Sequence, residues 1–385
     1  MEGAANLENL RKLASANNEF AFNMHRRLTE GTSDNVFFSP LSVFSVFSML
    51  YYGSVGETSE ELRKALGYDK ADIKDEVLHQ TFSDFLKNLL RMDRFTNDTI
   101  IHSANAVFVN RSMNIIPEFR RNIKEWYGAS FQEVDFSKDS EKVIRSINDW
   151  AKDQTHQKLK HLIGELNPAT LMVLLNALYF KAAWRTPFHQ NNSEKQDFFN
   201  NGQESEKKDM SFMTTTGEFR YSENDDFKAL ELPFKGDDVI MFILSPKKRN
   251  GLKSLEKNVT PNQFLTIHRE LDEKIINFSV PKFKLKSEKD LSSVLKTLGV
   301  KRMFDPKAAD FSDINFEGNS YVSQVLHKVE IIINEKGSEA SAATGVISCK
   351  ETSPEFAINH PFLFAIIEKG SGSEWILLLG RINNL

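Results

Sequence analysis

The chain has 385 residues, 40% of them hydrophobic and 26% charged, with 49 Lys and Arg against 53 Asp and Glu. This composition is typical of a globular protein with a large core, and the net charge of −4 argues against a nucleic-acid partner. The single cysteine, Cys349, excludes an intrachain disulfide and a cysteine-based metal centre. No apolar run is long enough to span a membrane, so we expect no membrane partner.

Helices are predicted in the first half of the chain. Ser39, followed by proline, predicts a helix start because a serine side chain can cap the first turn, and Gly53 predicts the end of that helix. Thr58 and Glu61 have the spacing of a capping box and predict a second, short helix. Apolar spacing predicts two more helices, over residues 75–92 and 140–163.

Strands are predicted in the rest of the chain. Residues 171–180 are apolar except for Asn176, which is typical of a strand covered on both faces. Residues 362–367 and 375–379 are two more apolar runs, and the glycines and serines of 370–373 between them predict a hairpin. No linker or repeat divides the chain, so we expect a single α+β domain over residues 1–385, with helices packed on a large central sheet.

Catalytic motifs are missing from the sequence. It contains neither the Gly-x-Ser-x-Gly turn of hydrolases nor the His-Glu-x-x-His pair of zinc enzymes, so we expect no enzyme activity and no metal site. Asn176 and His327 are polar residues inside apolar strands, and buried polar groups must be hydrogen-bonded. Both are therefore expected to belong to a polar network in the core.

Residues 335–344, which follow a predicted strand, are mostly small. A segment of this kind is typical of a surface loop that could also form a strand. It resembles the hinge of the serpins, the serine protease inhibitors, and specifically of their inhibitory members. Six further segments match signatures of that family in the expected order: 35–42, 53–58, 176–184, 280–283, 326–329 and 360–364.

The resemblance implies the serpin fold: a large central β-sheet, smaller sheets, about nine helices and an exposed reactive-centre loop at about 335–358. It also implies suicide-substrate trapping of a serine protease, in which the cleaved loop inserts into the central sheet while the protease is still bound as an acyl-enzyme. The native fold would then be kinetically rather than thermodynamically stable. We expect a secreted invertebrate member.

The hinge implied by the resemblance comprises Glu335, Gly337, Ser338, Glu339, Ala340, Ser341, Ala342, Ala343 and Thr344. Because side chains alternate along a strand, one face would carry only small, uncharged residues, and Glu339 would lie on the other face. Lys336 departs from the acidic residue that is usual in the family. The family's sheet-opening network corresponds here to Ser39, Ser42, Asn176, Trp184 and His327.

The scissile bond has two candidates. Family spacing counted from Gly337 places it between Glu351 and Thr352, whereas counting back from Pro361 places it between Lys350 and Glu351. We prefer the first, because the length of the inserted strand must suit its mechanical role in displacing the protease. A Glu351 bond requires a protease with a basic specificity pocket, and a Lys350 bond requires a trypsin-like acidic one.

The resemblance requires no cofactor, but Lys87, Arg91 and Arg94 match the helix that binds heparin in some relatives, so heparin or another glycosaminoglycan is a candidate accelerator. We expect a monomer whose main partner is its target protease. Secretion and regulation of an extracellular proteolytic cascade are favoured by analogy, with a cytoplasmic location as the alternative. The alternative function is that of a non-inhibitory serpin: a carrier, chaperone or storage protein.

Overall fold

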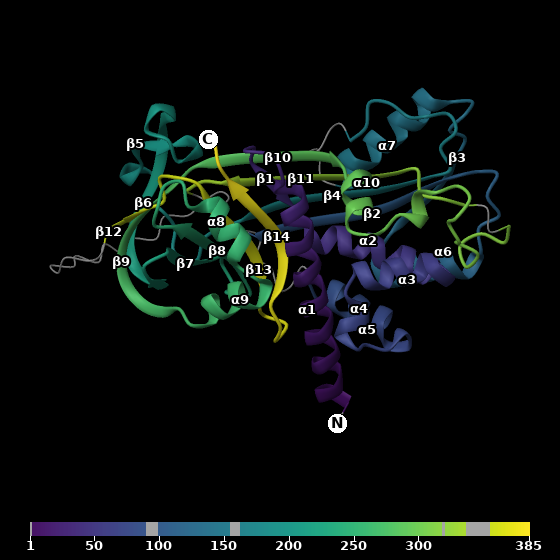
Figure 1. Cartoon of the computed structure of the whole chain (residues 1–385), viewed down its shortest axis with the longest axis horizontal. Coiled ribbons are helices and arrows are strands. Elements are labelled where there is room, and N and C mark those ends of the chain that lie inside the picture. Colours follow the sequence, from purple (N-terminus) through teal and green to yellow (C-terminus); the bar gives the residue numbers. More distant parts are fainter. Residues whose placement is uncertain (1, 90–98, 155–161, 318–319, 336–354) are drawn as a thin grey trace.

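The computed structural model describes residues 2–89, 99–154, 162–317, 320–335 and 355–385. Its strands form two sheets flanked by helices (Figure 1). The α+β class predicted from the sequence is confirmed. None of the described helices combines the length and the apolar character that a membrane span requires.

The five-stranded sheet is central to the site described below. Its strands, in spatial order, are β10 (Phe283–Asp290), β11 (Gln324–Ile333), β4 (Met172–Ala182), β2 (Thr99–Asn110) and β3 (Ser130–Val134). The β10–β11 and β4–β2 pairs are antiparallel, whereas β11–β4 and β2–β3 are parallel.

The second sheet has nine strands. Eight follow one path: β1 (Val36–Phe38), β14 (Trp375–Ile382), β13 (Phe362–Glu368), β8 (Val239–Pro246), β7 (Phe227–Pro233), β6 (Lys207–Glu223), β9 (Asp272–Pro281) and β12 (Glu355–Ala357). The ninth, β5 (Glu194–Phe199), pairs with β6 outside this path. Strands β13 and β14 are antiparallel neighbours, which confirms the hairpin predicted at residues 370–373.

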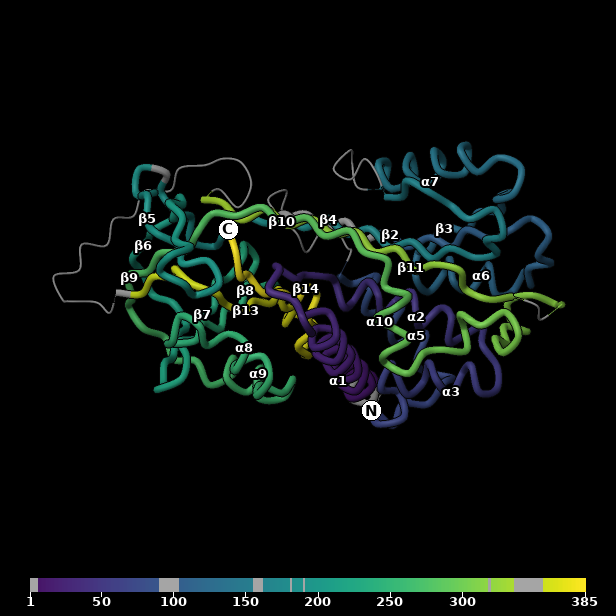
Figure 2. Tube along the Cα trace, turned by 45° about the horizontal axis from the view of Figure 1, so that its top comes forward, coloured from purple at the N-terminus to yellow at the C-terminus, as the bar shows by residue number. Residues whose placement is uncertain are grey.

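Ten α-helices occur among the described residues, against about nine expected. They are α1 (Glu2–Thr29), α2 (Pro40–Tyr52), α3 (Gly56–Ala65), α4 (Tyr68–Ala71), α5 (Asp75–Leu89), α6 (Pro117–Tyr127), α7 (Ser140–Gln154), α8 (Leu252–Asn258), α9 (Pro261–Arg269) and α10 (Ser292–Thr297). Figure 2 shows α7 on one side of the five-stranded sheet and α2 on the other.

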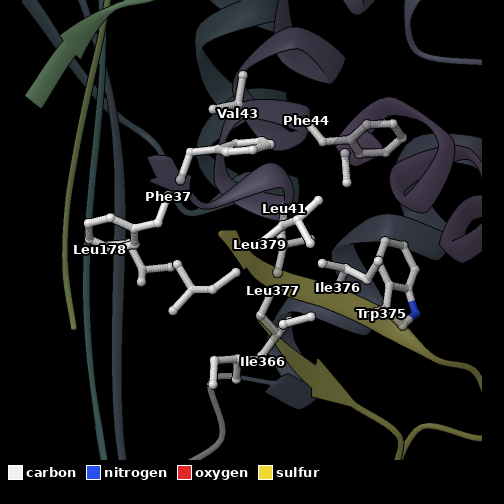
Figure 3. Close-up of a cluster of buried hydrophobic side chains, with 14 of the residues drawn as sticks. Phe37, Leu41, Val43, Phe44, Leu178, Ile366, Trp375, Ile376, Leu377 and Leu379 are labelled. Atoms are coloured by element: carbon white, nitrogen blue, oxygen red, sulfur yellow. The ribbon is translucent and has the colours of Figure 1, made fainter. Parts of the chain in front are cut away.

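Both faces of β4 are buried, as its apolar sequence predicts. Leu174 and Leu178 face the main core with α2, whereas Val173 and Leu175 face a smaller core with α7. Figure 3 shows the main core where Leu178 meets side chains of α2 and of the β13–β14 hairpin. Strand β4 is therefore enclosed between two apolar layers.

The predicted start of α2 is confirmed. Ser39 is its N-cap, with an extended backbone, and its hydroxyl accepts a hydrogen bond from the backbone N–H of Ser42 at 3.2 Å. Pro40 occupies the first helical position, and Gly53 is the C-cap. The local sequence rules hold here because the cap and the tertiary contacts agree.

The predicted capping box of the next helix is wrong. Helix α3 begins at Gly56, and its N-cap residue, Val55, makes no side-chain cap. The Thr58 hydroxyl instead accepts a hydrogen bond from the backbone N–H of Asp310 at 3.0 Å. Glu61 accepts one from the backbone N–H of Lys301 at 2.7 Å. The two side chains that the local pattern assigned to a cap therefore bind a segment that is distant in the sequence.

The predicted helix over residues 140–163 is too long. Helix α7 is described as far as Gln154, residues 155–161 lie outside the described part, and Leu162 and Ile163 are not helical. The Asn148 side chain accepts hydrogen bonds from the backbone N–H groups of both residues, at 2.5 and 3.0 Å. The helix predicted over residues 75–92 is described from Asp75 to Leu89.

Candidate functional site

The parallel contact between β4 and β11 is the candidate site, and we call it the seam. Eight residue pairs form it, from Gln324 opposite Val173 to Ile331 opposite Phe180. On either side the sheet continues through antiparallel pairs, β2–β4 and β10–β11 (Figure 1). Hydrogen bonds between parallel strands are slanted and slightly less stable per residue. The seam thus joins two antiparallel parts of the sheet through a weaker contact.

A neutral hydrogen-bond network lies in the middle of the seam. His327 of β11 is directly opposite Asn176 of β4, and its Nδ1 lies 2.7 Å from the side-chain oxygen Oδ1 of Asn176. The backbone N–H of Ser39 donates to Nε2 of His327 at 3.0 Å. Because Nε2 accepts, the ring proton is on Nδ1 and is donated to Asn176. Burial lowers the pKa of His327 to about 3, so the imidazole is neutral at physiological pH.

The network extends from the seam to three neighbouring elements. The Asn176 amide donates to the side-chain oxygen of Asn105 on β2, at 2.7 Å. The Ser39 hydroxyl donates to the carbonyl of Leu377 on β14, at 2.8 Å. Since Ser39 is also the cap of α2, the seam, β2, β14 and α2 meet at one polar point inside an apolar core.

The C-terminal end of the seam is fixed by a tryptophan. Trp184, just beyond β4, is buried, and its Nε1 donates to the carbonyl of Asn334 at 2.9 Å. Its ring stacks on Phe234, with centroids 4.5 Å apart. The backbone that leaves β11 is therefore held against the end of β4.

Glu335, the last described residue before segment 336–354, is also held in place. It is 6% exposed, accepts a hydrogen bond from the Ser193 hydroxyl at 2.6 Å and forms an ion pair with Lys282. Burial alone would raise the pKa of Glu335, but the hydrogen bonds from Lys282 and Ser193 outweigh burial and lower it. The carboxylate therefore stays ionised and paired.

The comparisons with known proteins agree with this geometry. Residues 15–385 match the family described as Serpin (serine protease inhibitor). The chain is a serpin. The serpin is 34% identical to Iripin-2 of Ixodes ricinus, over 97% of this chain and 94% of that protein. It is 33% identical to Serpin B6 of Macaca fascicularis, over 97% and 99% of the two chains. It is also 34% identical to intracellular coagulation inhibitor 2 of Tachypleus tridentatus, over 97% and 91%.

Solved structures confirm the serpin fold. Uncleaved ovalbumin, 26% identical, superposes with a TM-score of 0.88 over 97% of this chain and all of that chain. Human thyroxine-binding globulin, 27% identical, gives the same TM-score over 98% and 99% of the two chains. The family's description as protease inhibitors also confirms the expectation that this serpin is not an enzyme. Within the described residues, no cluster of His, Cys, Asp and Glu could hold a metal ion.

The outer face of the seam, on the side away from α2, carries charges. Glu330 of β11 is buried there and pairs with Lys284 and Lys286 of β10, at 2.8 and 3.3 Å. Lys328 pairs with Glu288 at 2.7 Å. The inner face of the same strand carries His327 and the apolar residues of the main core. The two faces of the serpin's seam therefore differ in their tolerance of charge.

The structure brings together four of the five network residues predicted from the sequence: Ser39, Ser42, Asn176 and His327. Trp184 lies at the end of the seam instead. Sequence reasoning missed Asn105, although it carries the same signal as Asn176, an amide inside an apolar strand. It also missed Ser193 and Lys282, which come from distant segments and carry no local signal.

Several predicted positions fall outside the described residues. These are hinge residues 337–344, both candidate scissile bonds at 350–352, Cys349, Arg91 and Arg94. Lys87 is described and is exposed in the last turn of α5. Its predicted partners in the polyanion-binding cluster are therefore known from sequence alone.

Proposed function

We propose that this serpin inhibits serine proteases by suicide-substrate trapping, with segment 336–354 carrying the scissile bond. The observation that carries the proposal is the position of Glu335. It anchors the chain at the C-terminal end of the parallel seam, immediately before that segment. A strand that turned back after Glu335 would run antiparallel to both β4 and β11. Insertion would replace one parallel contact with two antiparallel ones, which favours the inserted state.

The hinge sequence suits the two faces of the seam. Ser338, Ala340, Ala342 and Thr344 would point inward, towards a core in which an unpaired charge costs several kcal/mol. Glu339 would point outward, to the face where Lys284 and Lys286 lie. Asn176 and His327 would part as the strand enters, and both are neutral groups.

The proposed reaction begins as ordinary proteolysis. The protease's serine attacks the carbonyl carbon of the residue before the scissile bond, an ester forms, and the amine of the next residue leaves. Insertion of the freed hinge then carries the ester-linked protease away before water can hydrolyse it. The bond we favour is Glu351–Thr352, and the alternative is Lys350–Glu351.

Incubation with a panel of serine proteases tests the proposal. The panel should include enzymes with basic and with acidic specificity pockets. We expect an SDS-stable complex with at least one of them. We also expect release of a C-terminal peptide whose intact mass corresponds to a chain that begins at Thr352, or at Glu351 for the alternative bond. Cleavage of the loop without a complex, by every protease that cuts it, would contradict the proposal.

A non-inhibitory role is the second candidate, because one similar solved structure is thyroxine-binding globulin in complex with its hormone. Loop cleavage separates the two functions. In an inhibitor, the cleaved chain inserts and the melting temperature rises greatly, whereas in a non-inhibitory serpin it changes little. The two candidates thus predict different melting curves for one nicked sample.

We further propose that the serpin acts as a monomer outside the cell, on a proteolytic cascade. The name of one relative, intracellular coagulation inhibitor 2, supports a role in a proteolytic cascade, and the word intracellular in that name favours the alternative compartment. Heparin bound at Lys87, Arg91 and Arg94 would accelerate inhibition at low salt. Loss of that acceleration in a Lys87→Ala, Arg91→Ala variant is the expected result.

A further inference from the structure

A basic hollow of about 1080 Å³ lies where the end of α1 meets α8, residues 201–203 and the last residues of the chain. Six of its lining residues are Lys or Arg and two are Glu. In the whole chain, by contrast, acidic residues outnumber basic ones by 53 to 49. Positive charge is thus concentrated in one concave place on an acidic protein.

The two acids in the hollow do not cancel this charge. Glu256 is buried and is held by His25 at 2.8 Å and by Arg381 at 3.0 Å. Burial alone would raise the pKa of Glu256, but His25 and Arg381 outweigh burial and lower it. Glu256 and Arg381 therefore balance one another. Glu30 is largely exposed and faces Arg27 at 3.3 Å, an arrangement that contributes little.

Four exposed cations remain around the hollow, because a fifth exposed cation of the lining, Arg249, pairs with Glu204 at 2.6 Å. Arg26 and Arg27 lie in the last turn of α1, and Lys253 and Lys257 lie one turn apart on α8. Like charges at this helical spacing repel each other. Neither lysine forms an ion pair with any residue of the described ranges. A bound anion would remove this repulsion, and two helices would hold it from different sides.

The other lining residues indicate the class of anion. Amide and hydroxyl side chains also line the hollow, among them Asn23, Thr32, Ser33, Asn201, Gln203 and Asn383. Such groups exchange hydrogen bonds with sugar hydroxyls. The lining, all of it in the described part of the chain, includes no aromatic ring on which a nucleobase could stack. A flat membrane surface would not reach into a concave site.

From these observations we propose that the basic hollow binds a sulfated oligosaccharide, with Arg26, Arg27, Lys253 and Lys257 contacting its sulfates. This site is separate from the cluster proposed at Lys87, Arg91 and Arg94, because it is built from α1 and α8 rather than from α5. Binding at the hollow requires no protease, so it can be tested independently of the inhibitory function.

Titration calorimetry of the full chain with a heparin hexasaccharide at low salt tests the proposal. We expect the Lys253→Ala, Lys257→Ala variant to bind about tenfold more weakly, since it loses two exposed charge contacts. The matched control is Lys142→Ala, Lys307→Ala, which removes two exposed lysines outside the hollow and should stay within twofold of wild type. Affinity should also fall as NaCl is raised.

Three results would overturn the proposal. The first is equal affinity for the Lys253→Ala, Lys257→Ala variant and the wild type. The second is a larger loss of affinity in Lys87→Ala than in the Lys253→Ala, Lys257→Ala variant, which would assign binding to α5. The third is equally tight binding of a single-stranded hexanucleotide, which would exclude specificity for a sulfated sugar. An uncharged dextran oligomer of the same length should not bind.

Discussion

Two buried histidines of this serpin are held in opposite ways. His327 in the seam hydrogen-bonds to two neutral partners, Asn176 and the backbone of Ser39, and burial lowers its pKa to about 3. His268 on α9 lies between two carboxylates, with Nε2 2.7 Å from Glu231 and Nδ1 2.8 Å from Glu374. Burial alone would lower the pKa of His268, but these carboxylates outweigh burial and raise it.

This difference indicates at which buried contact the fold can separate at the lower cost in free energy. Glu231 also pairs with Arg220 at 2.7 Å and with Lys369 at 2.8 Å, so four segments converge on one buried ionic cluster. Separating such a cluster would leave charges unpaired in the core, at a cost of about 3–5 kcal/mol. Separating the neutral network of His327 and Asn176 leaves uncharged hydrogen-bonding groups, at about 1–3 kcal/mol each. The neutral contact lies where our proposal requires the sheet to open.

Adding a charge to the neutral region should have the largest effect. Ser338→Arg would place a guanidinium on the inward face of the inserting hinge, so we expect a nearly complete loss of SDS-stable complex while loop cleavage continues. Ser341→Arg is the matched control, because the same substitution falls on the outward face and should retain the complex. Equal complex yields from wild type and Ser338→Arg would show that this face does not enter the core.

Removing the carboxylate from the ionic cluster should have the next largest effect. Glu231→Ala leaves His268, Arg220 and Lys369 without their shared partner, and we expect about 3–5 kcal/mol less stability in urea unfolding. Glu218→Ala on β6, an exposed carboxylate, serves as control and should change stability by less than about 0.5 kcal/mol. Similar losses of stability in both variants would mean that the buried cluster stabilises the fold no more than an exposed carboxylate does.

Removing the neutral imidazole should have a smaller, more local effect. His327→Ala leaves the Ser39 N–H and the side-chain oxygen of Asn176 without a partner, at about 1–3 kcal/mol. Amide hydrogen exchange should accelerate in β4 and β11 more than elsewhere. The control is His360→Ala, another buried histidine, which lies near the end of β8 rather than in the seam. If both variants accelerate exchange in the seam alike, the network does not hold it closed.

The two histidines should also give opposite pH trends. The pKa of His327 is lower in the folded state, so below about pH 6.5 only the unfolded chain takes up the proton and stability falls. The pKa of His268 is higher in the folded state, so its contribution is complete below pH 6.5 and disappears as pH rises through the folded pKa.

Urea unfolding of His327→Gln and His268→Gln between pH 5.5 and 8.5 measures this contrast. The stability advantage of wild type over His327→Gln should shrink as pH falls, by at most about 1.4 kcal/mol per pH unit. The advantage over His268→Gln should shrink as pH rises. Parallel trends for the two variants would show that their surroundings do not differ as described.

Sequence reasoning succeeded where local pattern and tertiary structure agree. The cap at Ser39 and the apolar run of β4 are local signals, and the amide at Asn176 stands out against that run. It failed at Thr58 and Glu61, whose side chains bind backbone from residues 301–310. The basic hollow could not be predicted from local patterns because its walls come from six separate segments.

The anchoring of Glu335 has a consequence for the length and parity of the segment that follows. At roughly 3.3 Å per residue, an extended strand from Glu335 to Glu351 would carry its end about 50 Å from the anchor. A single inserted residue after Glu335 would lengthen that path only slightly. It would, however, exchange the faces of every hinge side chain and turn Glu339 towards the core. Under the proposed insertion, the anchor that Lys282 gives to Glu335 would set the point from which odd and even positions of the hinge are counted.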